Sequence, residues 1–187
     1  MQKDCLVIAL APSIISAPRI ETARLILDAH ALGDFEALAA VWEDPEVVRH
    51  ISGKPSTREQ SWSRLLRYAG LWPLLGFGYW AVREKPTGRY IGDVGFADFH
   101  RPIEPSIIGI PEAGWVLASE AHGRGFGSEA LAAVLAWLDR STAHRRVVCL
   151  IADDNRASFR LAEKNGFHRA GGLTVGFENT SLLTRDG

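Results

Sequence analysis

The stretch that decides the fold is a short apolar segment followed by a glycine-rich turn: Trp115-Val116-Leu117, then His122-Gly123-Arg124-Gly125-Phe126-Gly127-Ser128-Glu129. The apolar segment predicts a buried strand, and the apolar residues that recur after the turn predict a helix with one buried face. Alternating glycines at a helix start let the backbone adopt positive φ angles, so that several N–H groups can point at phosphate oxygens. The helix dipole favours an anion there, and Arg124 adds a positive charge. Glycines that merely relieve crowding would give the same pattern, so this segment alone leaves both interpretations open.

The rest of the chain alternates between strand and helix patterns. Further strands are predicted at 24–28, 78–83, 90–99, 147–152, 167–175 and 181–184. Helices are predicted over 32–42, 62–72 and 155–164, with Asp44-Pro45 ending the first, Pro73 and Gly76 closing the second, and Asn165-Gly166 stopping the last. The resulting order, β-α-α-β-β-β-α-β-α-β-β, indicates an α/β protein with a mixed sheet and helices on its faces.

Composition excludes several functional classes. The chain has 187 residues, which suits one domain, and 21 Lys plus Arg against 22 Asp plus Glu give a net charge of −1. That balance argues against nucleic acid as the main partner. No apolar run reaches the roughly 20 residues that a membrane span needs, so no membrane partner is expected. The histidines show no metal-ligand spacing, so no metal is expected either.

The chain is expected to consist of a short N-terminal segment and one domain, with both cysteines reduced. Residues 1–18 are expected to form an extended leader, because Asp4 and Pro12 interrupt a signal-peptide pattern, and residues 19–187 to form a single domain. Two cysteines cannot make a disulfide framework, and Cys149 lies in an apolar run where a small buried residue fits. A reducing, cytoplasmic location is expected for both thiols.

Three familiar phosphate-binding motifs do not match the glycine turn. A Walker loop requires Gly-Lys-Ser/Thr, whereas Gly127 is followed by Ser128 and Glu129. A dinucleotide fingerprint requires a third glycine where Ser128 stands and an acidic residue about 20 positions later, where an apolar run occurs instead. The strand lysine and acidic metal ligands of a kinase are missing as well.

The same residues resemble the GNAT superfamily of N-acetyltransferases. His122-x-x-Gly125-x-Gly127 is similar to its acyl-CoA signature, (Gln/Arg)-x-x-Gly-x-(Gly/Ala), and Glu129-Ala130-Leu131 follows as it commonly does there. Four further segments are similar to the subgroup of ribosomal-protein N-terminal acetyltransferases (RimJ/RimL type), in the same order along the chain: 20–27, 91–96, 154–158 and 163–167. The resemblance covers the chain from about residue 19 to 183. It implies a mostly antiparallel sheet of about seven strands.

The resemblance also implies acetyl-CoA as acyl donor and an amine acceptor, either a small molecule or a protein N-terminus. It implies cofactor binding by residues of one strand, the glycine turn and the following helix: Val116, Leu117, His122, Gly123, Arg124, Gly125, Phe126, Gly127, Ser128, Asn155 and Ser158. The strand would pair with the pantetheine arm, and its N–H groups would stabilise the oxyanion. Asn155 also fits an ordinary helix N-cap.

Amine acylation requires a proton acceptor and a donor to the leaving sulfur, and the resemblance implies which residues supply them. Glu112 is a candidate general base, because relatives often carry a glutamate before this strand, and Ser158 is by similarity a possible donor to the sulfur. Asp98 and His100 are weaker candidates for the base. Glu112 fits a solvated loop acid equally well. Two positions depart from the family pattern: His122 replaces the usual Gln or Arg, and Ala162 stands where many relatives carry a tyrosine general acid.

Two other functions stay open at this stage. The missing tyrosine gives some weight to a non-catalytic acyl-CoA-binding module, and the glycine turn is compatible with a nucleotide-phosphate binder. The acceptor pocket is expected from the first two helices and the loop 100–111, with Trp72 and Trp80 as possible lining residues. The three arginines at 140, 145 and 146 are expected on a solvated face, or near the 3′-phosphate of CoA. The oligomeric state is open, a homodimer being one option.

Overall fold

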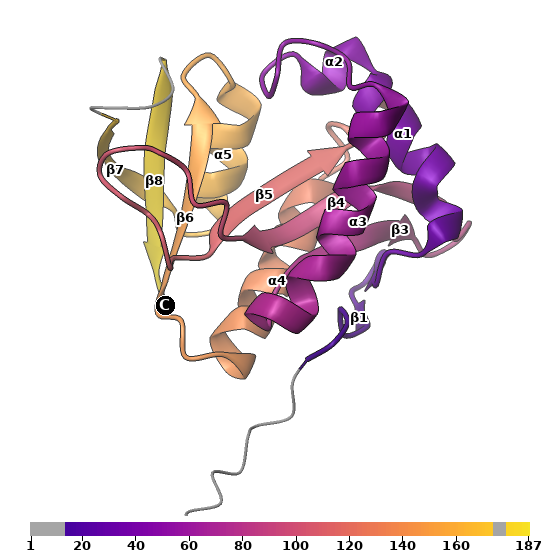
Figure 1. Cartoon of the computed structure of the whole chain (residues 1–187), viewed down its shortest axis with the longest axis horizontal. Helices are drawn as coiled ribbons and strands as arrows, with labels where there is room; N and C mark the ends of the chain where they lie inside the picture. The colour runs from indigo at the N-terminus through magenta and orange to yellow at the C-terminus, as the bar shows by residue number, and fades with distance from the viewer. Residues whose placement is uncertain (1–13, 174–178) are drawn as a thin grey trace, which may run out of the picture.

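A single twisted sheet forms the centre of the computed structural model, which describes residues 14–173 and 179–187 (Figure 1). The strands are β1 (Ile20–Glu21), β2 (Leu25–Asp28), β3 (Tyr79–Glu84), β4 (Tyr90–Ala97), β5 (Glu112–Leu117), β6 (Arg146–Ala152), β7 (His168–Gly172) and β8 (Thr180–Asp186). The helices are α1 (Phe35–Glu43), α2 (Pro45–Val48), α3 (Arg58–Leu75), α4 (Phe126–Ser141) and α5 (Arg156–Lys164), with 3₁₀ turns η1 (Leu32–Asp34) and η2 (Ser119–Ala121).

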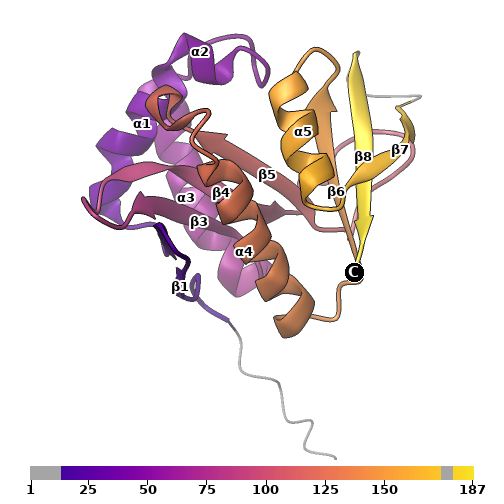
Figure 2. The same cartoon turned by 180° about the vertical axis from the view of Figure 1, so that it is seen from behind.

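The sheet has the order β1-β2-β3-β4-β5-β6-β8-β7, and every neighbouring pair is antiparallel except β5 with β6. This confirms the mixed, mostly antiparallel α/β fold, with eight strands where about seven were expected. The additional strand is β1, which pairs through two residues with β2. Helices α1, α2 and α3 lie on one face, and α4 and α5 lie on the other (Figure 1, Figure 2). Because both faces are covered, β4 is buried along its whole length.

Helix boundaries differ from expectation at the start of α3, which lies at Arg58 after the N-cap Thr57, and at two prolines. Pro45 does end α1, but it also begins α2, because proline is well tolerated at the first helical position, and Asp44 caps that helix through the N–H of Glu46. Pro73 does not close α3, which continues to Leu75 and ends at the left-handed Gly76. A proline in the last turn breaks one backbone hydrogen bond without stopping the helix.

The tryptophans named as possible lining residues belong to the core. Trp72 and Trp80 are fully buried and pack edge-to-face at 4.6 Å between ring centroids, and Trp137 of α4 meets Trp80 at 5.1 Å. Their expected place in the acceptor groove is therefore wrong, since their rings fill the space under α4. Cys149 is buried as expected, and burial raises the pKa of its thiol far above the usual range.

The segment before β1 is held to the domain. The indole Nε1 of Trp80 donates to the Pro18 carbonyl at 2.7 Å, and Ala17 is buried in the main core. Residues 1–13 lie outside the described part of the chain, so the leader assigned to residues 1–18 stays a prediction. Residues 174 and 175 of the strand predicted over 167–175 also lie outside it. None of the helices in the described part combines the length and apolar character that crossing a bilayer requires.

One junction in the sheet is incomplete. β5 pairs with β4 along all six of its residues, but it pairs with β6 only where Glu112 meets Val148. One further bond, from the Val148 N–H to the Pro111 carbonyl, lies at the same end. Beyond this end the two strands separate, as Figure 2 shows, and no described strand pairs with the edge of β5 that faces β6. A gap therefore opens between β5 and β6.

Candidate active site

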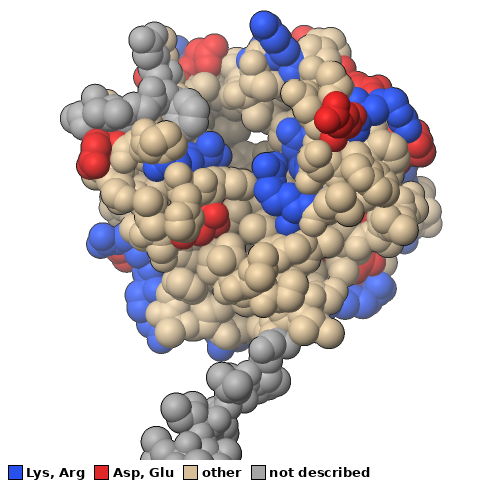
Figure 3. Space-filling model, in the orientation of Figure 1, with Lys and Arg blue, Asp and Glu red and all other residues tan. Residues whose placement is uncertain are grey.

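A cavity of about 320 Å³ occupies the gap between β5 and β6. Four of the residues expected in the site line it together: Glu112 and Val116 from β5, and Asn155 and Ser158 from the start of α5. The other wall comes from β6 through Leu150 to Ala152. The opposite end is formed by α1, α3 and the loop after β4, which agrees with the expected composition of the acceptor pocket. Figure 3 shows the molecule hollowed near its middle, with Lys and Arg side chains close to the opening.

The remaining expected residues lie beside this cavity, where the glycine turn leads from β5 into α4. Gly123 and Gly125 have φ angles of 71° and 79°, which L-residues rarely adopt. Gly125 is the N-cap of α4, and no side chain caps the helix in its place. The first N–H groups of a helix have no carbonyl partner inside it, so those of Phe126, Gly127 and Ser128 are available to an external acceptor. This turn therefore has the donor arrangement of an anion site.

Side chains around the turn hold it in place. His122 contacts the Leu117 carbonyl through Nε2 at 2.8 Å, which ties the turn to the end of β5. Arg124 forms an ion pair with Glu84 at 2.6 Å and lies over the Phe126 ring, so its charge is already partly neutralised. At Gly127, a Cβ atom would approach the Leu161 side chain to 2.7 Å, so glycine lets α5 pack closely there.

Glu129 connects the first turn of α4 to the segment before β2. Its carboxylate accepts hydrogen bonds from the Thr22 hydroxyl at 2.6 Å, the Arg24 N–H at 2.9 Å and the Arg24 Nε at 2.7 Å. Burial opposes ionisation of Glu129, but these hydrogen bonds outweigh it and hold the pKa of the carboxyl below its usual value. The Arg24 Nη1 also donates to the Arg124 carbonyl, so this network supports the glycine turn itself.

We expect Glu129→Gln to lower the free energy of unfolding by about 1 kcal/mol at pH 7, since charge-assisted hydrogen bonds are lost. A lowered pKa stabilises the folded protein above the unfolded-state value of 4.5, and this stabilisation disappears as the pH falls through the folded-state pKa. Urea unfolding of both proteins at pH 7 and pH 3 should show the difference shrinking at low pH. Glu163→Gln, on an exposed position of α5, is the control. An equal difference at both pH values would contradict this assignment.

Asn155 and Ser158 are joined by local hydrogen bonds. Asn155 caps α5, its Oδ1 accepting from the Ser158 N–H at 3.0 Å, so the N-cap interpretation is confirmed. The Ser158 hydroxyl accepts a hydrogen bond from the Trp115 indole Nε1 at 3.2 Å. That contact fixes the hydroxyl oxygen at the cavity wall and leaves its proton available for donation.

Glu112 is not a solvated loop acid. It is 7% exposed and forms a bidentate ion pair with Arg101, with Nε to Oε2 at 2.6 Å and Nη2 to Oε1 at 2.9 Å. Arg101 reaches it from the loop after β4 and stacks over Phe99 at 4.6 Å. The weaker base candidates lie elsewhere: His100 is mostly exposed, and Asp98 accepts hydrogen bonds from the backbone of its own loop.

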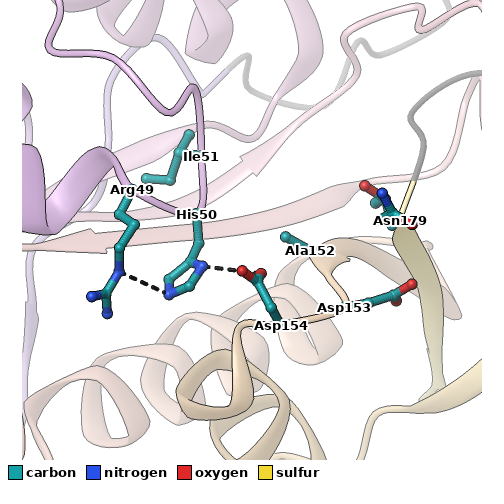
Figure 4. A pocket seen from close by; sticks show the side chains of 8 residues that line it. Arg49, His50, Ile51, Ala152, Asp153, Asp154 and Asn179 are labelled. Atoms are coloured by element: carbon teal, nitrogen blue, oxygen red, sulfur yellow. Dashed lines mark hydrogen bonds and ion pairs between the residues drawn. The ribbon is translucent and has the colours of Figure 1, made fainter.

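A second, wider recess of about 700 Å³ adjoins the cavity, with His50, Ile51, Ala152 and Thr180 shared between them. At this recess the segment after α2 meets the turn between β6 and α5 (Figure 4). The His50 Nδ1 contacts the Asp154 carboxylate at 3.0 Å, and the Arg49 Nε donates to the other ring nitrogen at 3.2 Å. These contacts join the two sides of the gap across its open end.

Several residues of the site carry no local sequence signal. Arg101 lies eleven positions from Glu112, and Trp42 and Tyr79 appear in the sequence as ordinary helix and strand residues. The exposed arginines at 140, 145 and 146 lie at or beyond the C-terminal end of α4, about 24 Å along the helix from the glycine turn. This position supports the solvated face expected for them. In the described ranges, no three His, Cys, Asp or Glu side chains gather in a way that could hold a metal.

A family model described as "Acetyltransferase (GNAT) domain" matches residues 24–168. The chain belongs to the GNAT acetyltransferase family. It is 32% identical over 161 residues to the uncharacterized N-acetyltransferase YoaA of Bacillus subtilis, covering 83% of this chain and 86% of that protein. As a GNAT acetyltransferase, it is an acyl-CoA-dependent enzyme.

Solved structures agree with this membership. A putative GNAT-family acetyltransferase from Bordetella pertussis superposes with a TM-score of 0.79 at 33% identity, over 90% of this chain and 99% of that one. RimL, a ribosomal L7/L12 α-N-protein acetyltransferase solved in complex with coenzyme A, shares the fold with a TM-score of 0.71 at 20% identity, over 90% and 98% of the two chains.

The residues present fit a CoA thioester. The uncapped N-terminus of α4 offers backbone donors to a diphosphate, and the free edge of β5 offers backbone groups to the amides of a pantetheine arm. The cavity that begins between β5 and β6 continues this path toward Glu112 and Ser158.

Proposed function

We propose that this enzyme transfers the acetyl group of acetyl-CoA to a primary amine, and that the transfer takes place in the cavity between β5 and β6. One observation carries the proposal: the glycine-rich start of α4, which has no side-chain cap, follows β5, whose edge borders the open gap. When bound, acetyl-CoA supplies the thioester whose acyl carbon bonds to the amine nitrogen as its C–S bond breaks.

The backbone is proposed to hold the cofactor. The N–H groups of residues 123–128 bind the diphosphate, and Val116 and Leu117 pair with the pantetheine arm as an added strand would. His122 acts through its backbone, since its ring is engaged by the Leu117 carbonyl. Arg124 positions the turn through its ion pair with Glu84. The Asn155 Oδ1 caps α5, and its amide nitrogen is proposed to donate a hydrogen bond to the cofactor.

Three groups are proposed to act in the chemical step. Glu112, the one carboxylate that lines the cavity in the described part of the chain, accepts the proton that the ammonium form of the acceptor loses, directly or through a water. A backbone N–H of β5 stabilises the negative charge that develops on the acyl oxygen. The Ser158 hydroxyl, fixed by Trp115, donates a hydrogen bond to the leaving sulfur, in place of the tyrosine that Ala162 replaces.

The proposed acceptor is a small molecule or a protein N-terminus. RimL is named for acetylating the N-terminus of a ribosomal protein, but its 20% identity to this chain carries the fold alone. We place the enzyme in the cytoplasm, where a free thiol such as Cys149 stays reduced.

The experiment is a calorimetric titration of the protein with CoA, followed by thiol release from acetyl-CoA in the presence of an amine panel. We expect saturation at micromolar CoA and release of thiol that depends on the amine. Absence of saturation at millimolar CoA would overturn the cofactor site. Saturation without turnover on any amine would instead favour a non-catalytic acyl-CoA-binding module, and thermal protection by ATP but not by CoA would favour a nucleotide binder.

A further inference from the structure

The acceptor end of the cavity is lined mainly by aromatic rings: Trp42, Tyr68, Tyr79 and Phe99. Tyr68 and Tyr79 stack at 4.3 Å between centroids with an interplanar angle of 11°. The Tyr79 hydroxyl lies against β5 at Gly114, where any Cβ atom would collide with it. Apolar walls with a few fixed polar groups are typical of a pocket for a small molecule.

Two arginines of α3 stack on rings of this wall. The Arg64 guanidinium lies 3.4 Å from the Trp42 ring centroid, and the Arg67 guanidinium lies 5.4 Å from that of Phe99. Residues three apart on a helix share a face, so both guanidinium groups lie on the side of α3 that meets these two rings. Burial lowers the pKa of the Arg64 guanidinium, and the charge of Arg67 lowers it further. A bound anion would relieve both effects.

Within the described residues, neither arginine has a carboxylate at ion-pair distance. Arg64 has only the Ser56 hydroxyl, at 3.4 Å, and its stacking contact with Trp42. By contrast, Arg58 at the start of the same helix pairs with Glu36 at 2.6 Å, and Arg101 pairs with Glu112. In the described ranges, the α3 side of the cavity thus carries positive charge that no carboxylate meets in an ion pair, and Figure 3 shows Lys and Arg side chains beside the hollow.

The carboxylate whose charge acts on Arg64 is already engaged by other groups. Asp93 of β4 is fully buried, and its oxygens contact His30 Nε2 at 2.7 Å, the Tyr90 hydroxyl at 2.5 Å and the Trp42 indole at 3.4 Å. Asp93 therefore holds Trp42, the ring beneath Arg64, without pairing with Arg64 itself. The cavity therefore has a carboxylate, Glu112, at its β5 end, and the rings of Trp42 and Phe99 at its α3 end carry the guanidinium groups of Arg64 and Arg67.

We propose that the acceptor is a small amine that also carries a carboxylate, of the amino-acid class, and that Arg64 and Arg67 bind this carboxylate. The planar guanidinium fits the geometry of a carboxylate and has the opposite charge. The amine of the acceptor then lies toward Glu112, where it is acylated. This inference rests on the proposed acetyl transfer, and it adds the substrate class and two specificity-determining residues to it.

The test compares each of the twenty amino acids with its own amide, which keeps the side chain and the amine but lacks the negative charge. Thiol release from acetyl-CoA gives kcat/KM for both members of a pair, and calorimetric titration of the CoA-loaded enzyme gives their affinities independently of turnover. We expect at least one amino acid to exceed its amide by about 10-fold or more in both measurements.

The double variant Arg64→Gln/Arg67→Gln should reduce this preference to about twofold or less, by raising KM for the acid and leaving the amide unchanged. Arg58→Gln, which removes one charge from the same helix, should keep the preference, and CoA titration shows that each variant retains its cofactor site. Amides that bind and react as well as their acids, or equal losses on both in the double variant, would overturn the inference and leave acetyl transfer standing. Failure of CoA to saturate the protein would overturn the proposed function itself.

Discussion

Glu112→Gln should lower kcat/KM for the acceptor by about 100-fold at pH 7, which is the lower end of what a general base contributes. Glutamine keeps the size of the side chain and one acceptor oxygen for Arg101, but it cannot take up the proton of the ammonium group. The loss should shrink as the pH approaches the pKa of the amine, because a neutral amine needs no base. Affinity for CoA should stay within about twofold, since no expected CoA contact involves Glu112.

Steady-state kinetics between pH 6 and 10 test this expectation, with CoA titration reporting on the integrity of the fold. Glu59→Gln, on an exposed turn of α3, controls for the loss of one negative charge. A purely structural role for the Glu112–Arg101 pair predicts a loss that is the same at every pH. A kcat/KM within twofold of the unmodified enzyme from pH 6 to 9 would remove Glu112 from the mechanism.

Gly125→Val should weaken CoA binding by about 10- to 100-fold, the equivalent of one charge-assisted hydrogen bond. Gly125 has a φ of 79°, and valine strongly disfavours this conformation, so the peptide must rotate. Rotation at the N-cap moves the N–H groups of the first turn of α4 away from the site where we expect the diphosphate.

Gly88→Val is the matched control for backbone strain. Gly88 lies in the turn between β3 and β4 with a φ of 66°, and no atom of the described residues lies within 4 Å of a Cβ built there. At Gly125 the end of the Arg24 side chain comes to 3.4 Å of such a Cβ, an ordinary contact with a flexible group. Both variants should lose about 1–2 kcal/mol of unfolding free energy, and only Gly125→Val should lose CoA affinity. Equal CoA affinity in the two variants would show that the glycine turn does not bind the diphosphate.

The sequence predicted the elements whose signals are local. The hairpin of β3 and β4, the N-cap at Asn155 and the glycine turn before α4 all have short-range causes, namely β-branched and aromatic runs, a side-chain acceptor and residues free to adopt positive φ angles. Pro45 was interpreted only as a stop, although it is equally suited to begin a helix, and α2 was missed for that reason.

Contacts that depend on packing could not be predicted in the same way. Which tryptophans line the cavity depends on how α1 and α3 rotate against the sheet, and this places Trp42 at the cavity and Trp72 in the core. The bidentate contact of Arg101 with Glu112 joins a loop to a strand, and neither residue type specifies the other. The sequence also does not show that Arg64 and Arg67 lack a carboxylate partner, because this depends on how nearby carboxylates such as Asp93 pair in the folded protein.

The single bridge between β5 and β6 has a consequence for the unfolding of the protein. The two halves of the sheet, β1 to β5 and β6 to β8, are joined at one register pair, so each half can open locally with little effect on the other. A ligand that forms hydrogen bonds along the open edge of β5 would couple the two halves. Amide protons of β5 and β6 should then exchange more slowly, and at similar rates, when CoA is bound.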